Sequence, residues 1–116
     1  MAEKPLVLLH GEMKSPPLSV SARMQAGFLL RQLQKGMRLG MPDSRPMPSI
    51  GARCHELRIP DPETGRTWRV MYRLDPDVVL VAEVFAKKTP QTPKTVIDAC
   101  KRRLKRYDDM LEGGQK

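Results

Sequence analysis

The sequence predicts an α+β domain, in which three consecutive β-strands form a meander, with one helix before the meander and one after it. Two observations carry this prediction. Between residues 54 and 88, two segments alternate apolar and polar side chains, and a third segment is an almost unbroken apolar run. Residues 19–36 and 93–111 instead repeat apolar side chains every three or four positions, as amphipathic helices do.

The meander strands are expected at residues 54–59, 67–74 and 78–86, because turn sequences separate them. The turns are DPETG (61–65) and DPD (75–77), which combine proline with aspartate or glycine. The third segment is almost continuously apolar and β-branched, which is typical of a central strand.

Each meander strand has two faces, because side chains alternate across a strand. On the second strand, one face carries Trp68, Val70, Tyr72 and Leu74, and the other carries Arg69, Met71 and Arg73. On the first strand, Glu56 and Arg58 lie opposite Leu57 and Ile59. The sheet is therefore expected to have an apolar side and a side with fixed positive charge. Cations held on a rigid sheet are what an anionic-ligand site needs.

The first helix is expected over residues 19–36. Ser19 or Ser21 can cap its start, because a serine oxygen accepts an orphan backbone N–H there, and Gly36 can end it. The side chains expected to face the sheet are those of Met24, Phe28, Leu29 and Leu33. Gly27 weakens the middle of the helix, so a close backbone contact is expected at this position.

Two segments flank this helix. Residues 5–9 are short and apolar and are expected to form a fourth strand. Residues 39–53 contain three prolines and two glycines and are expected to form a structured loop, in which Arg45 is more readily explained as a solvent-exposed side chain.

The second helix is expected to start at Thr92 and Pro93, as N-cap and first helical residue, and to run to about Leu111. Three-and-four spacing predicts one buried face, made of Val96, Ile97, Cys100, Leu104, Tyr107 and Leu111. The basic residues between them more often form a solvated face than a binding site.

The composition limits the function classes. The 116 residues suit a single domain spanning 1–116, and 21 Lys and Arg against 13 Asp and Glu give a net charge of +8. A domain this basic most often binds nucleic acid or an acidic protein. Two cysteines and two histidines supply neither a disulfide framework nor a zinc ligand set, so no metal and no cofactor are expected. No apolar run is long enough to span a bilayer, and a cytoplasmic protein is expected.

Five motifs, in this order, resemble those of a known family. They are GEMKSPP (11–17), SRPMPSIG (44–51), CHELRI (54–59), TWRVMYR (67–73) and FAKKTPQTP (85–93), followed by a basic helix. The chain resembles the RelE/ParE superfamily of type II toxins, and most closely its HigB-like, phage-derived branch. The resemblance implies a RelE-like α+β fold, in which the N-terminal and C-terminal helices pack on one face of an antiparallel sheet of about four strands.

The resemblance also implies a function. It implies the toxin of a type II toxin–antitoxin system that is a ribosome-dependent mRNA endonuclease, or mRNA interferase. The implied partners are the ribosome, mRNA and a cognate antitoxin, which often carries a helix-turn-helix DNA-binding domain. Some branches of the superfamily poison gyrase instead, so the fold alone does not decide the function. The alternative is therefore a gyrase-directed ParE-like toxin, or a non-catalytic protein that only binds its antitoxin.

The candidate catalytic residues are Arg69, Glu56, Lys87 and Lys88, and the candidate RNA-binding residues are Arg58, Arg73 and Arg45. Without a metal, the nucleophile must come from the substrate, and RNA offers its 2′-OH. Arg69 matches the arginine of the family's R-x-x-Y strand motif and is expected to hold the phosphate, because a guanidinium can bind two oxygens at once. Arg58 matches the arginine that closes the family's ELR strand. Lys87 or Lys88 matches the basic residue that aids the transition state or the leaving group.

Two roles stay open for Glu56. It is either the general base, as a glutamate is in other members, or a partner that positions Arg69 or Arg58. Tyr72 belongs to the R-x-x-Y motif but should point to the opposite face, so it is expected in the core. His55 shares a face with Leu57 and is expected to be structural. No residue is assigned as the general acid.

Overall fold

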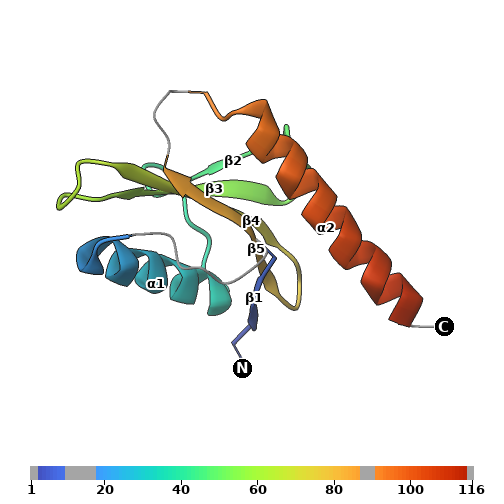
Figure 1. The fold of residues 1–116 in the computed structure, drawn as a ribbon. Coiled ribbons are helices and arrows are strands. Elements are labelled where there is room, and N and C mark those ends of the chain that lie inside the picture. The colour runs from blue at the N-terminus through green and yellow to red at the C-terminus, as the bar shows by residue number, and fades with distance from the viewer. Residues whose placement is uncertain (1–2, 10–17, 87–90, 115–116) are drawn as a thin grey trace.

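The computed structural model describes residues 3–9, 18–86 and 91–114, and all structural statements below concern these ranges. They form five strands and two helices (Figure 1). In chain order these are β1 (Leu6–Leu8), α1 (Val20–Gln34), β2 (Ser44–Pro46), β3 (Cys54–Pro60), β4 (Thr67–Leu74), β5 (Val79–Ala86) and α2 (Lys94–Gly114). The predicted meander, both helices and the N-terminal strand are confirmed, with bounds that differ by a few residues. No helix in this part of the chain is both long and apolar enough to cross a membrane.

The sheet has five strands in the order β1-β5-β4-β3-β2, so the prediction of about four strands is wrong. The missed strand is β2, a three-residue edge strand that pairs antiparallel with β3 inside the segment expected to be a loop. Its last residue, Pro46, has no N–H to donate, which an edge strand tolerates. The sheet is also not purely antiparallel, because β1 pairs with β5 in the parallel sense.

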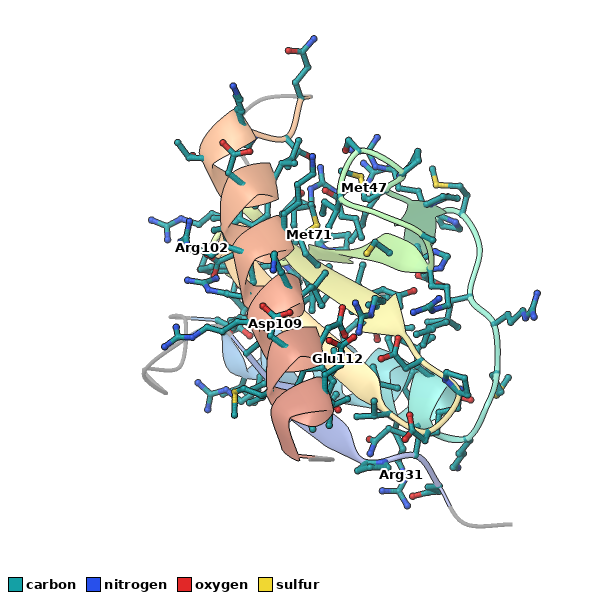
Figure 2. All side chains as sticks on the ribbon, turned by 90° about the vertical axis from the view of Figure 1, so that its right-hand side faces the viewer. Arg31, Met47, Met71, Arg102, Asp109 and Glu112 are labelled. Atoms are coloured by element: carbon teal, nitrogen blue, oxygen red, sulfur yellow. The ribbon has the colours of Figure 1, made fainter. Side chains whose placement is uncertain are left out.

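The two helices cover opposite faces of the sheet, so the prediction that both pack on one face is wrong (Figure 1). The α1 face contains Leu57, Ile59, Trp68, Val70, Tyr72, Val79 and Val81. The α2 face contains Cys54, Met71, Val78, Leu80 and Ala82. The first half of β5 (Val79 to Ala82) is apolar and buried on both sides, and such a strand needs cover on both sides. Figure 2 shows Met71 on the sheet beside α2, and its side chain is fully buried.

The start of α1 is fixed to the turn between β3 and β4. The predicted Ser19 cap is confirmed, because its Oγ accepts a hydrogen bond from the Ala22 backbone N–H at 3.1 Å. The same hydroxyl donates to Asp61 at 2.6 Å, and the Trp68 indole N–H donates to Asp61 at 3.1 Å. Burial alone would raise the pKa of Asp61, but these hydrogen bonds to its charged form outweigh burial and hold the pKa well below its usual range.

The buried face of α1 differs from the prediction. Leu29 and Leu33 are buried as expected, but Met24 is 70% exposed and Phe28 is 58% exposed. The expected close contact at Gly27 is also absent, because an added Cβ would meet no atom within 4 Å. The helix therefore carries apolar side chains on its outer side as well as its inner side.

The inner face of α2 agrees largely with the prediction. Cys100 and Leu104 are buried, and Val96, Ile97 and Tyr107 pack partly buried around them. The last predicted member, Leu111, is 51% exposed, because the final turns of α2 extend past the sheet (Figure 1).

Candidate functional site

The predicted site residues on three adjacent strands share the α2 face of the sheet. Arg45 on β2 lies directly opposite Glu56 on β3, and Arg58 on β3 lies directly opposite Arg69 on β4. Directly opposed residues point to the same face of a sheet. The register therefore gathers three guanidinium groups and one carboxylate, which we call the β2–β4 arginine cluster (Arg45, Arg58, Arg69 and Glu56).

Glu56 is the centre of this cluster and is fully buried. Its Oε1 accepts a hydrogen bond from the Arg45 Nε at 3.0 Å and lies 3.9 Å from the Arg69 Nε. Its Oε2 accepts a hydrogen bond from the Thr92 hydroxyl at 3.4 Å. A buried carboxylate is stable only when it is paired and hydrogen-bonded. Glu56 therefore links β2, β4 and the segment that leads into α2.

Arg69 is buried, and its Nε and Nη1 atoms have no hydrogen-bond partner in the described parts of the chain. Burial lowers the pKa of Arg69, the negative charge of Glu56 opposes this shift, and the positive charges of Arg58 and Arg45 add to it. Buried donors without hydrogen-bond acceptors are costly, and an anion that reached this guanidinium would supply both acceptors and opposite charge.

Arg73, the remaining predicted RNA-binding residue on β4, lies in a different set of contacts. Its Nε and Nη2 donate to Asp75 at 2.8 and 2.9 Å, and its Nη1 and Nη2 donate to Asp108 at 3.1 and 2.7 Å. The Asp108 hydrogen bonds raise the pKa of Arg73, against the effect of burial, and Asp75 adds to the rise. This guanidinium ties α2 to β4, a structural role that argues against contact with RNA.

Thr92 is the member of the site that the sequence did not assign. It was expected only as a helix cap, but its hydroxyl contacts Glu56, and the first helical hydrogen bonds instead reach the Pro93 carbonyl from Val96 and Ile97. Thr92 and Glu56 are 36 residues apart, and no local pattern predicts their meeting.

Lys87 and Lys88 lie outside the described residues, as does the 11–17 motif, so their predicted roles stay predictions. The chain reaches Lys87 from the end of β5, where Phe85 pairs with Arg69 and Ala86 with Trp68.

Tyr72 and His55 lie on the α1 face, as expected. Tyr72 is buried, its hydroxyl shares a 2.6 Å hydrogen bond with Ser44, and burial raises its pKa. The His55 ring stacks on it with centroids 5.3 Å apart, and burial lowers the pKa of His55. Both act in packing.

The described chain has a hollow of about 480 Å³, but it lies on the α1 face beside His55 and Leu33. None of the β2–β4 arginine cluster lines it, so this hollow is separate from the cluster. No group of three or more His, Cys, Asp or Glu side chains among the described residues could hold a metal ion.

Comparison with known proteins identifies a family to which the chain belongs. A search of curated proteins gives no match to the chain. A family model described as phage-derived protein Gp49-like (DUF891) matches residues 16–105, a stretch that includes α1, β2 to β5 and the first part of α2. The chain therefore belongs to the family of phage-derived Gp49-like proteins, a family related to RelE-like toxins.

Proposed function

We propose that the protein is the toxin of a type II toxin–antitoxin system of the HigB-like branch, and that it cleaves mRNA on the ribosome. Membership of the Gp49-like family supports the toxin part of this proposal. The net charge of +8 supports a nucleic-acid substrate. The observation that carries it is Arg69, a buried cation in a positively charged cluster with two donor nitrogens that have no hydrogen bond within the described chain.

The proposed reaction uses the substrate's own nucleophile. The 2′-OH oxygen forms a bond to the adjacent phosphorus and loses its proton, the bond from phosphorus to the 5′-oxygen breaks, and that oxygen takes up a proton. The products are a 2′,3′-cyclic phosphate and a 5′-OH. Charge on the phosphate oxygens rises in the transition state, and Arg69, with Arg45 and Arg58 beside it, is suited to stabilise that charge. The ribosome would align the mRNA for in-line attack.

For Glu56 we propose the positioning role rather than that of general base. The carboxylate is fully buried and accepts hydrogen bonds from Arg45 and Thr92, so it holds charge in the cluster and does not face solvent. Lys87 or Lys88 is proposed to aid the departure of the 5′-oxygen. The proposed partners are the ribosome, mRNA and an antitoxin with a helix-turn-helix DNA-binding domain.

The burial of Glu56 also favours the second candidate, a gyrase-directed or non-catalytic toxin. If Glu56 only positions Arg69, the described residues of the cluster contain no accessible carboxylate or imidazole base. Measurement of DNA supercoiling by gyrase in the presence of the protein separates this candidate from an mRNA endonuclease.

The decisive substrate is an mRNA on the ribosome with a single 2′-deoxy sugar at the cut site. Cleavage at that bond should be abolished, while cleavage of the matched all-ribose mRNA leaves a 2′,3′-cyclic or 3′-phosphate. Arg69→Ala should lower the cleavage rate by a factor on the order of 10²–10³, as loss of a transition-state donor does elsewhere. Arg106→Ala is the control, because Arg106 is exposed on α2 and makes no contact with the cluster among the described residues. Undiminished cleavage at the deoxy position would exclude attack by the 2′-OH.

A further inference from the structure

The outer side of α1 carries a row of large apolar side chains that nothing in the described chain covers. Val20 is 68% exposed, Met24 is 70% exposed and Phe28 is 58% exposed. They recur every four residues and therefore lie along one side of the helix, which we call the α1 outer stripe (Val20, Met24 and Phe28). The inner side, with Ala22, Leu29 and Leu33, is buried against the sheet.

The helix cannot roll to bury this stripe, because both of its ends are tied down. At the start, Ser19 donates to Asp61 at 2.6 Å, and Ser21 donates to Glu63 at 2.7 Å. At the end, the Gln34 side-chain amide donates to the Lys4 carbonyl at 2.8 Å, and the Lys4 N–H donates to the Gln34 carbonyl at 2.8 Å. The stripe is therefore presented outward by a fixed helix. A surface helix that is apolar on two opposite sides is expected to pack against something on each side.

Gly27 lies within this outward side, between Met24 and Phe28. A glycine in mid-helix weakens the helix relative to alanine, and an added Cβ would meet no atom within 4 Å, so packing inside the chain does not require the glycine. A missing side chain on an exposed apolar stripe does permit another backbone to approach closely.

The charges beside the stripe select the partner. Arg31 lies one turn beyond Gly27 and forms an exposed ion pair with Glu3 at 3.6 Å, and Arg23 on α1 and Lys35 at its C-cap are also exposed. Figure 2 shows Arg31 at the edge of the molecule, far from Arg102 on α2. A second copy of this chain would bring the same arginines and a second charge of +8 to the contact, which disfavours self-association. An acidic helix would complement them.

We propose that the α1 outer stripe is the docking site for an amphipathic, acidic helix of the cognate antitoxin. The helix would place its apolar residues against Met24 and Phe28, approach closely at Gly27, and pair its carboxylates with Arg23 and Arg31. The identity of the partner as an antitoxin rests on the proposed function. The stripe lies on the helix that covers the opposite face of the sheet from the β2–β4 arginine cluster. The partner would therefore bind without contacting Arg69 through this helix.

The test uses the full chain and the protein encoded by each adjacent reading frame, with the dissociation constant as the readout. Met24→Glu should weaken binding of the partner protein at least about tenfold, because it places a carboxylate in an apolar contact with an acidic helix. Met110→Glu is the matched control, since Met110 is 71% exposed on α2 and its substitution should leave binding unchanged. Gly27→Gln should raise the melting temperature, because glutamine is the better helix former, and should nevertheless weaken binding.

Three results would overturn the inference. They are equal binding of the Met24→Glu and Met110→Glu variants, no binding by any adjacent product, and a wild-type dimer that Met24→Glu dissociates. The last would make a second copy the occupant. Growth separates this inference from the proposed function, because Met24→Glu should remain toxic and escape neutralisation. If the wild-type protein cleaves no mRNA but Met24→Glu still abolishes binding of the partner, only the proposed ribonuclease activity is contradicted.

Discussion

Glu56 holds a carboxylate where no solvent reaches it, and its described partners come from β2, β4 and the segment before α2. Glu56→Gln keeps the shape of the side chain and removes its charge. It leaves Arg45 and Arg69 close together without a counter-charge, so we expect the free energy of unfolding to fall by about 3 kcal/mol. Urea unfolding measures this value. A loss below about 0.5 kcal/mol would show that the charge of Glu56 does not hold the cluster together.

The same substitution separates the two roles of Glu56. If Glu56 positions Arg69, the cleavage rate of Glu56→Gln should fall while the pH profile of the remaining activity keeps its shape. If Glu56 is the general base, the substitution should instead remove the acidic limb of that profile. Asp43→Asn is the control, because Asp43 is also acidic and precedes β2, and its side chain forms no hydrogen bond or ion pair with the cluster among the described residues.

At the scale of the elements, Asp61 joins α1 to the sheet through hydrogen bonds from Ser19 and Trp68. Its folded-state pKa lies below the value of about 3.9 in an unfolded chain. The stability that it contributes is therefore present above that unfolded value and is lost as the pH falls toward the folded value. We expect the melting temperature to drop below about pH 4, and Asp61→Asn to flatten that drop.

Fluorescence of Trp68, the one tryptophan in the sequence, follows this transition directly. The control is Asp77→Asn, which changes an exposed carboxylate in the β4–β5 turn. An acid transition in the Asp61→Asn variant as steep as that of the wild type would show that other carboxylates control it.

Local sequence patterns predicted where the elements lie better than where they pack. The bounds of β4 agree with the alternation of residues 67–74, and Ser19 caps α1 as expected, because both depend on neighbours in the chain. The missed β2 strand has only three residues, too few for a periodic signal, and it forms because β3 offers it an edge.

The wrong face assignments have a different cause. Met24 and Phe28 repeat at helical spacing, but that spacing does not say which of two apolar sides meets the sheet. Met71 does share its face of β4 with Arg69 and Arg73, as expected, but that face was predicted to be charged, and Met71 with Leu80 and Ala82 gives it an apolar part that α2 covers. Contacts such as Arg73 with Asp108, 35 residues apart, depend on the finished packing, and no local pattern contains them.

At the scale of the whole molecule, positive charge is distributed over both the sheet and α2. Figure 2 shows Arg102 on α2 pointing away from the sheet, whereas Arg58 lies in the β2–β4 arginine cluster. The chain carries an excess charge of +8, so the binding of RNA under the proposed function is expected to depend strongly on salt. The slope of that dependence counts the phosphates that the protein neutralises. A substitution that changes the slope therefore shows that the replaced cation belongs to the binding surface.

For a short single-stranded RNA, the logarithm of the association constant should fall linearly with the logarithm of the salt concentration, by about 0.7 for each phosphate contacted. Arg58→Gln should make the slope shallower by about 0.7, because it removes one such contact from the cluster. Arg102→Gln carries the same loss of charge on the outer side of α2 and should leave the slope unchanged. Fluorescence anisotropy between about 50 and 200 mM salt measures both slopes. If Arg102→Gln changes the slope and Arg58→Gln does not, the RNA follows the outer face of α2, and the arginine cluster on the sheet is not where it binds.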